Sequence, residues 1–338
     1  MTNVMWFNEI GLGDIASVGG KNASLGEMVR ALADEGIRVP SGFATTADAY
    51  RKFLKDNGLN GSIRAALKRL KQSSPTLSEA GRTIRSLILD GDFSEDMKSD
   101  LCSSYDRLAE EVGKADPAVA VRSSATAEDL ADASFAGQHE SFLNVRGKAP
   151  LLDACRRCYA SLFTDRAISY RELKGFDHLE VALSIGVQRM VRSDKAGSGV
   201  MFTLDPETGF PNAIVISAAW GLGETVVQGT VDPDKYTVFK PLLADPRNAP
   251  IIEKSVGAKA VKLTYASRGS RRTRLVDTTR AERERFVLSD PEILQLARWA
   301  VAVEAHYGRP MDLEWAKDGE TGELFLVQAR PETVQAAR

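Results

Sequence analysis

Two stretches near the end of the chain alternate apolar and polar residues with a period of two, the pattern of half-buried β-strands. They are residues 311–317, MDLEWAK, and residues 323–330, ELFLVQAR, and the DGETG between them supplies turn residues. This pattern predicts a β-hairpin. If its register pairs Glu314 with Gln328, then Asp312 lies opposite Arg330. One face of the hairpin then carries two carboxylates, an amide and a guanidinium.

The opposite face of this hairpin is expected to be apolar. It is predicted to carry Met311, Leu313, Trp315, Phe325 and Val327. The oxygen ligands of the polar face suit Mg²⁺, which binds one or two carboxylates together with nucleotide phosphates, and an adjacent guanidinium matches phosphate geometry. A surface hairpin with a cross-strand Asp–Arg ion pair explains the same residues. The pattern alone therefore leaves both interpretations open.

Helical periodicity dominates an early part of the chain and indicates a scaffold, because no residue there suggests chemistry. Helices are predicted over residues 46–57, 61–72, 78–89 and 94–113, separated by turn residues such as Asn57-Gly58. Another amphipathic helix is predicted over residues 290–307. Strand-like stretches follow the early helices, among them residues 118–121, 183–191 and 199–204.

Two segments have the composition of phosphate-binding loops. A glycine pair precedes Lys21 at a predicted helix start, where backbone N–H groups and a cation meet an anion. The spacing differs from a Walker A loop, which needs glycine where Ile15 stands and a hydroxyl where Asn22 stands. A strand at residues 118–121 leads to Arg122 and several hydroxyl residues. A solvated lysine and turn-capping serines remain the alternatives.

A third segment has the pattern of a hinge. Residues 183–191 and 199–204 are strand-like, and the polar RSDKAGS between them is expected to be a flexible linker between two lobes. Exposed backbone at residues 188–191 would contact the edge of an adenine, with Met190 against the ring. A central strand with an ordinary turn explains this segment equally well. The GLG at residues 221–223 is too short to be specific.

Composition narrows the class of protein. A chain of 338 residues with 43% apolar and 27% charged residues is typical of a soluble globular protein with two lobes. A net charge of −2 gives no reason to expect nucleic acid or a membrane as partner. The chain has no apolar run of membrane-spanning length and no signal peptide, which predicts a cytoplasmic location. Cys155 and Cys158 lack the second pair of a zinc ribbon and are expected to be structural.

Several long motifs, in order along essentially the whole chain, resemble the N-terminal nucleotide-binding domain of the phosphoenolpyruvate synthase (pyruvate, water dikinase) and pyruvate, phosphate dikinase family. The motifs are GGKNASLGEM, VRSSATAEDL, DASFAGQ, VQRMVRSD, GVMFTLDPETGF, AAWGLGETVVQG, HYGRPMDLEW and LFLVQARPETVQ. The resemblance implies an ATP-grasp fold, in which ATP lies between two α+β lobes and Mg²⁺ is held on the acidic hairpin. We expect a first lobe over residues 1–192, with a helical insertion at about 46–113, and a second over residues 193–338.

The resemblance also implies roles for individual residues. Lys21 and Arg122 match the phosphate-binding cations of the family, and with Arg330 they are the expected catalytic residues. The other expected ATP contacts are Ser134, Phe135, Ala136 and Gly137 of a phosphate loop, Gln188, Met190 and Val191 of the adenine hinge, and Glu314 and Gln328 of the hairpin. The expected Mg²⁺ ligands are Asp312, Glu314 and Gln328. Ala131 stands where the family usually has proline, a change expected to loosen the loop without removing a ligand.

The implied activity is that of an ATP-dependent dikinase in pyruvate metabolism and gluconeogenesis. The family converts ATP, pyruvate and water into AMP, phosphoenolpyruvate and phosphate through a phosphohistidine on a separate swivelling domain. His139, His178 and His306 lack the sequence context of that carrier, and no stretch remains for a pyruvate-binding domain. We therefore expect either the nucleotide-binding part of a longer enzyme or a truncated gene product. The missing domains of the full-length enzyme would be its partners. The chain itself is expected to bind Mg·ATP without completing the reaction alone.

Other readings stay open at this point. The chain also resembles the ATP-binding domain of the rifampin phosphotransferases, which likewise use a phosphohistidine on a swivelling domain. A nucleotide-binding module without its own reaction belongs to a different class. A degenerate family member that has lost ATP is disfavoured, because Lys21, Arg122, Glu314, Gln328 and Arg330 are all present. A homo-oligomer of the full-length enzyme is also left open.

Overall fold

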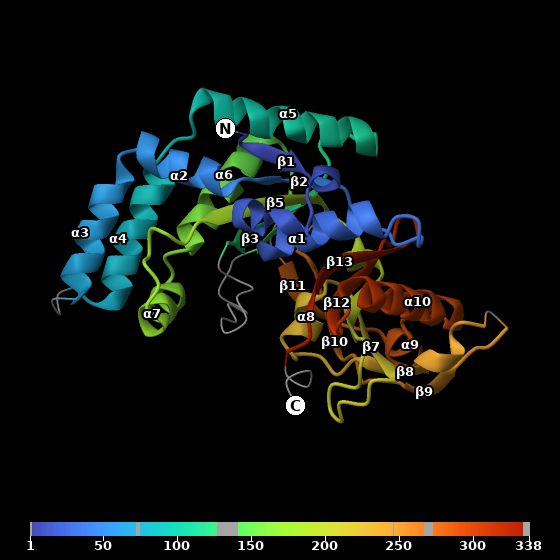
Figure 1. Ribbon diagram of the computed structural model, residues 1–338. Helices are drawn as coiled ribbons and strands as arrows, with labels where there is room; N and C mark the ends of the chain where they lie inside the picture. The colour runs from blue at the N-terminus through green and yellow to red at the C-terminus, as the bar shows by residue number, and fades with distance from the viewer. Residues whose placement is uncertain (1, 72–74, 127–140, 246, 267–272, 334–338) are drawn as a thin grey trace. The chain divides into compact units, whose positions relative to one another are not determined.

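The computed structural model describes residues 2–333 except 72–74, 127–140, 246 and 267–272. The chain forms two compact units, each with its own sheet and helices, so the α+β class is confirmed (Figure 1). Unit 1 comprises Met1–Glu27 and Ser41–Met190, and unit 2 comprises Met28–Pro40 and Val191–Arg338. Residues 28–40 join unit 2, where the Leu326 N–H donates to the Arg38 carbonyl at 2.8 Å. The division expected from the sequence kept them in the first lobe.

The sheet of unit 1 has five antiparallel-paired strands in the order β1-β2-β5-β3-β4. Their bounds are β1 Val4–Trp6, β2 Gly42–Thr45, β3 Val119–Ala125, β4 Ser141–Val145 and β5 Leu183–Arg189. The central strand β5 is buried over six consecutive residues, LSIGVQ. A strand that is covered on both faces has a continuous run of buried residues in its sequence instead of alternating apolar and polar residues.

The helices of unit 1 confirm the scaffold expected from periodicity. They are α1 Ile15–Ala31, which continues into unit 2, α2 Ala47–Asp56, α3 Leu59–Lys71, α4 Leu77–Asp90, α5 Glu95–Val112, α6 Lys148–Ser161 and α7 Asp165–Lys174. Helices α3 and α4 lie side by side (Figure 1), while α2 and α6 pack on the sheet. Cys155 and Cys158 of α6 are fully buried in this core, as a structural role requires, and burial raises the pKa of Cys155.

The larger sheet of unit 2 has six strands in the order β13-β12-β6-β7-β8-β9. Their bounds are β6 Gly197–Phe202, β7 Ala213–Trp220, β8 Asp234–Phe239, β9 Ile251–Ser255, β12 Met311–Lys317 and β13 Leu324–Pro331. A two-stranded sheet pairs β10, Val261–Tyr265, with β11, Thr273–Asp277. Unit 2 also has two short helices, α8 Glu224–Val227 and α9 Arg280–Arg283. Short 3-10 helices lie at Phe7–Glu9 and Leu12–Asp14 in unit 1, and at Ser193–Lys195 and Lys240–Leu242 in unit 2.

One long helix covers one face of the six-stranded sheet. Helix α10, Asp290–Tyr307, contacts β7, β8, β9 and β12 (Figure 1). Its buried side chains are Ile293, Leu296, Ala297, Trp299, Ala300 and Val303. The apolar residues of β12, including Leu313 and Trp315, are buried on the strand's apolar face, so the polar residues that alternate with them point the other way. Among the described residues, no helix combines the length and apolar content needed to span a bilayer.

A fully buried ion pair lies in unit 2, where the sequence pattern predicts nothing of the kind. The Lys259 ammonium contacts Asp234 Oδ1 and donates to the carbonyls of Gly257 at 3.0 Å and Arg283 at 3.3 Å. Neither side chain of the pair is exposed to solvent. Asp234 also accepts the N–H groups of Gly257 and Val287, at 3.0 and 2.8 Å. This pair joins β8 to the segments before β10 and α10.

Candidate functional site

The hairpin of β12 and β13 has the register expected from the sequence. Asp312 pairs with Arg330, and Glu314 pairs with Gln328. Arg330 Nε and Nη2 donate to Asp312 Oδ2 at 2.8 and 2.7 Å. The Asp312 side chain is 12% exposed, whereas that of Arg330 is 47% exposed. The four polar residues therefore lie on one face, with the carboxylate set back and the guanidinium open to solvent.

A β-bulge follows directly and corrects part of the expected pattern. Beyond Glu314 the register shifts, so that Trp315 pairs with Leu326 and Ala316 pairs with Phe325. Val327 is the extra residue of β13. Because one extra residue reverses the alternation of side chains, the prediction that Phe325 and Val327 share the face of Trp315 is wrong. Phe325 instead lies on the face of Glu314.

This reversal creates a small apolar cluster next to the polar residues of the hairpin. Val191, Ala316 and Phe325 are buried together, and Val327 packs against them. Val191 is the first residue of the segment that leads from the expected adenine hinge into unit 2. The bulge thus brings one expected adenine contact beside the hairpin that carries the expected metal ligands.

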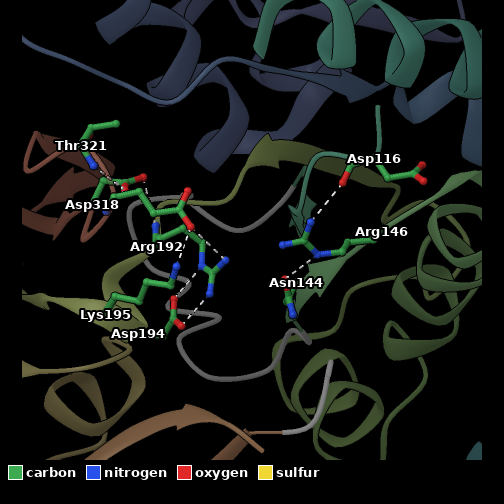
Figure 2. A network of polar contacts seen from close by, with 9 residues as sticks. Asp116, Asn144, Arg146, Arg192, Asp194, Lys195, Asp318 and Thr321 are labelled. Atoms are coloured by element: carbon green, nitrogen blue, oxygen red, sulfur yellow. Dashed lines mark hydrogen bonds and ion pairs between the residues drawn. The ribbon is translucent and has the colours of Figure 1, made fainter. Parts of the chain in front are cut away.

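The segment after Val191 is held by the hairpin turn, so the expectation of a flexible linker is wrong there. The Arg192 N–H donates to Asp318 Oδ2 at 3.3 Å, and the Arg192 carbonyl accepts the Gly319 N–H at 3.1 Å. The Arg192 guanidinium binds both carboxylate oxygens of Asp194 at 2.8 Å (Figure 2). Backbone and side-chain contacts therefore both fix residues 192–195 within unit 2.

In unit 1, the glycine pair before Lys21 packs against the strand that carries Arg122. Gly19 has φ +73°, which interrupts α1, and a Cβ there would lie 2.3 Å from Ser124 Oγ. No side chain fits between the two segments. Asn22 is buried, and its Nδ2 donates to Ser184 Oγ of β5 at 2.9 Å. Lys21 therefore lies in the first turn after the interruption of α1, next to the sheet.

Two of the expected site residues of unit 1, Arg122 and Gln188, lie on one face of its sheet. The register of β3 and β5 pairs Arg122 with Gly186, Ser124 with Ser184, and Ala120 with Gln188. Since alternate residues share a face, Arg122 and Gln188 lie on the face against which Gly19 and Asn22 pack. The other face carries Val121 and Ile185 of the apolar core. The sequence pattern could not predict this arrangement, because the residues that share the face are far apart in the chain.

The backbone of the adenine hinge differs from the expectation. Gln188 is only 3% exposed, and β5 pairs it with Gly42 on one side and Ala120 on the other. The Met190 N–H donates to the Ala118 carbonyl at 2.8 Å. The prediction of exposed backbone is therefore wrong for Gln188 and for this N–H group, because β5 is an interior strand. The Met190 side chain is half-buried.

Several expected residues lie outside the described residues. These are Ser134, Phe135, Ala136 and Gly137 of the phosphate loop, together with Ala131 and His139. Within the described ranges, no three His, Cys, Asp or Glu side chains gather as a metal-binding group. The hairpin offers two carboxylates and the Gln328 amide, an all-oxygen set. Such a set fits Mg²⁺ when phosphates supply further ligands.

One described histidine has structural contacts instead of the surroundings of a phosphoryl carrier. His178 is buried, and its Nδ1 accepts a hydrogen bond from Arg171 Nε at 2.9 Å. Its Nε2 lies 2.7 Å from Glu172 Oε1, which selects the tautomer protonated at Nε2. Burial lowers the pKa of Arg171 to about 10. This histidine ties α7 to the loop that follows it.

Glu332 is a residue of the hairpin that the sequence analysis missed. It follows β13, is 7% exposed, and its N–H donates to the Pro310 carbonyl at 2.9 Å. Burial raises the pKa of Asp312, the Arg330 charge opposes that rise, and the Glu332 charge adds to it. The signal was available, because Glu332 stands two residues after Arg330 and so continues the same face.

The raised pKa of Asp312 predicts an unusual pH dependence for the Mg²⁺ binding that is expected of this hairpin. Mg²⁺ needs the ionised carboxylate, so metal-dependent nucleotide affinity should fall with decreasing pH earlier than for an ordinary aspartate, whose pKa is about 3.9. Because the folded-state pKa is raised, the contribution of Asp312 to stability is present at low pH and lost as pH rises through that pKa. Calorimetric titrations at decreasing pH test this, and Asp312→Asn should remove the early fall. An unchanged pH profile in Asp312→Asn would contradict it.

The chain is similar to known proteins over almost its whole length. Residues 15–338 match the family described as "Pyruvate phosphate dikinase, AMP/ATP-binding domain". The chain is 53% identical to a phosphoenolpyruvate synthase of Synechocystis sp., over 99% of the chain and 42% of that protein. It is 52% and 50% identical to those of Pseudomonas aeruginosa and Escherichia coli, each over 98% of the chain and 42% of the relative. The chain thus spans less than half the length of these relatives.

Proposed function

The chain belongs to the family of pyruvate phosphate dikinase AMP/ATP-binding domains, and from that premise we propose that it binds Mg·ATP as the phosphoryl-donating part of a phosphoenolpyruvate synthase. The observation that supports this most directly is the register of β12 and β13. It places Asp312, Glu314, Gln328 and Arg330 on one face of unit 2. That combination of oxygen ligands and a guanidinium matches a metal-bound triphosphate.

We propose the ATP-grasp fold for the chain, with both units contributing to nucleotide binding. Its support is that each unit has an antiparallel-paired sheet with one face packed against helices. The other face carries Arg122 and Gln188 in unit 1 and the polar residues of the β12–β13 hairpin in unit 2. Unit 1 contributes Lys21, Arg122 and Gln188, and unit 2 contributes Val191 and the hairpin. The phosphate-loop residues 134–137 and the lobe boundary at residue 192 remain predictions.

The proposed site residues have two roles, which are metal binding and neutralisation of the phosphate charge. Asp312, Glu314 and Gln328 would hold Mg²⁺, which when bound supplies positive charge to the phosphate oxygens. Arg330, Arg122 and Lys21 would donate hydrogen bonds to phosphate oxygens, strongest where charge increases during transfer. Phosphoryl transfer depends mainly on such positioning and electrostatics. The nucleophile would come from another domain of the enzyme.

The complete reaction is proposed for a longer protein. The named relatives are phosphoenolpyruvate synthases, and this chain covers 42% of each of the three described above. We propose that other domains carry the phosphohistidine and the pyruvate site, and that Mg·ATP binding by this chain serves them. These relatives favour a phosphoenolpyruvate synthase over a rifampin phosphotransferase. A cytoplasmic location, as expected from the sequence, is part of the proposal.

Isothermal titration of the chain with ATP, with and without Mg²⁺, tests the proposed function. Glu314→Ala should weaken binding about tenfold in the presence of Mg²⁺, since a charged ligand is lost, and should change binding little without the metal. A matched control is Glu323→Ala in the same hairpin, because the Glu323 side chain is 43% exposed and its carboxylate lies 3.5 Å from Arg38 Nε. Absence of ATP binding in the wild type, or equal losses with and without Mg²⁺, would contradict the proposal.

A further inference from the structure

The turn of the β12–β13 hairpin is organised by one buried carboxylate. Asp318 is 5% exposed, and its Oδ1 accepts the N–H groups of Glu320 at 2.7 Å and Thr321 at 3.3 Å. Its own N–H donates to the Glu323 carbonyl at 2.8 Å. An aspartate that binds the amides of following residues is a common way to close a turn. One carboxylate oxygen is enough for that purpose.

The second oxygen of Asp318 binds a different segment. Oδ2 accepts the Arg192 N–H at 3.3 Å (Figure 2). The Arg192 carbonyl in turn accepts the Gly319 N–H at 3.1 Å. The fit is close, because a Cβ on Gly319 would lie 2.5 Å from Lys195 Cβ and 2.7 Å from its carbonyl carbon. We call this pairing of residues 192–195 with residues 318–320 the turn contact.

Charged side chains reinforce the turn contact. Arg192 forms a two-bond pair with Asp194, whose side chain is 7% exposed. The Lys195 ammonium donates to Glu320 Oε1 at 2.7 Å, and Arg192 Nη1 lies 3.6 Å from the same oxygen. Isolated ion pairs on a surface contribute little to stability. Here the bidentate geometry, the burial of Asp194 and the shared carboxylate of Glu320 form a network.

The turn contact joins two parts of the proposed ATP site within unit 2. Val191, the proposed adenine contact, precedes Arg192 and is buried with Ala316 and Phe325. Ala316 lies two residues after Glu314 on β12, on the same face. The backbone beside the adenine and the strand that carries the metal ligands are therefore held together at two places, the apolar cluster and the turn contact.

We propose that Asp318 and Arg192 are positioning residues that fix the separation between the adenine contact at Val191 and the metal ligands of β12. The proposal rests on the proposed function. A fixed separation matters for a ligand that spans both places, since ATP gains affinity when its two ends bind without further ordering of the protein. It does not matter for a ligand that reaches only one of them. Neither residue needs to touch the nucleotide.

This distinction gives a test with three ligands on the 338-residue chain. Adenosine probes the adenine contact, Mg²⁺-tripolyphosphate probes the metal and phosphate contacts, and Mg·ATP probes both together. Disruption of the turn contact should weaken Mg·ATP binding about tenfold and leave the affinities for the two fragments within about twofold. A residue with a general structural role would change all three affinities, and a residue that contacts one end of the nucleotide would change one fragment.

Two variants disrupt the turn contact by different means. In Asp318→Asn the amide oxygen can still accept the turn N–H groups, while the amide nitrogen faces the Arg192 N–H and cannot accept it. In Gly319→Ala the new methyl group meets Lys195. The matched control is Asp245→Asn, because Asp245 accepts the Arg247 N–H at 3.0 Å in another turn of unit 2. Thermal unfolding of each variant shows whether it remains folded.

The outcomes separate this inference from the proposed function. A loss confined to Mg·ATP in both variants, with Asp245→Asn unchanged, supports the positioning role. Equal losses for all three ligands, or Mg·ATP affinity within twofold of the wild type, overturn it while leaving the proposed function intact. If the wild type does not bind Mg·ATP, both proposals fail.

Discussion

Lys259→Met is expected to lower the free energy of unfolding by about 3–5 kcal/mol, the range for removing one partner of a buried ion pair. The Asp234 carboxylate would remain fully buried without its cation. Two N–H groups and the Tyr236 hydroxyl, which donates at 3.2 Å, would still bind it. Hydrogen bonds from neutral donors do not replace a whole charge in a low-dielectric interior. The free energy of unfolding of a typical domain is about 5–15 kcal/mol, so a loss of this size is a large fraction of it.

Chemical denaturation measured with a probe in unit 2 would test this prediction. The matched control is Lys235→Met. Lys235 is the neighbour of Asp234 on β8, its side chain is 56% exposed, and its ammonium lies 3.8 Å from the Glu207 carboxylate. That control should cost less than about 1 kcal/mol, since surface ion pairs contribute little. If Lys259→Met stayed within about 1 kcal/mol of the wild type, the pair would not stabilise unit 2 as described.

Arg330→Ala is expected to weaken Mg·ATP binding about 100-fold while leaving adenosine binding unchanged. Removing a charged, two-donor contact with phosphate costs about 2–3 kcal/mol, which corresponds to that factor. The Arg330 side chain is 47% exposed although its guanidinium binds Asp312, so it can also reach a ligand. Arg330→Lys should recover only part of the affinity, because lysine keeps the charge but loses the planar pair of donors.

Calorimetric titration with ATP, ADP and adenosine would separate the contributions. Arg247→Ala is a suitable control, because Arg247 also binds an aspartate through Nε and Nη2, at 2.9 and 2.6 Å, and is 88% exposed. It lies outside the proposed site and should leave every affinity unchanged. Equal losses for adenosine and ATP in Arg330→Ala would contradict the phosphate role of Arg330.

The hairpin shows which features a local sequence pattern can predict and which it cannot. Alternation along residues 311–317 and 323–330, together with a turn of suitable composition, was sufficient for the strands and for the pairing of Asp312 with Arg330. The same alternation could not reveal the bulge after Glu314. An extra residue leaves the apolar and polar character of its neighbours unchanged, and only the pairing of the second strand shows where the register shifts.

The linker after Val191 shows the opposite case. Its polar composition predicted flexibility, yet Arg192 is bound by Asp318, 126 residues later in the chain. The contact of Gly19 with Ser124 and the pair of Lys259 with Asp234 are likewise formed by residues distant in sequence. Periodicity describes a segment and its immediate neighbours, so it carries no information about which distant segment will pack against it.

Local sequence was sufficient to predict the helical scaffold of unit 1 and the polar face of the hairpin, and the long motifs were sufficient for the family and, through it, for the α+β class. These features depend on local periodicity, on turn composition or on long matching motifs. Tertiary structure alone decided that Arg122 and Gln188 share a face with the Lys21 segment, that Phe325 faces the Glu314 side, and that residues 192–195 are held by the hairpin turn. The physical reason is that pairing register and long-range packing are set by the free energy of the whole fold.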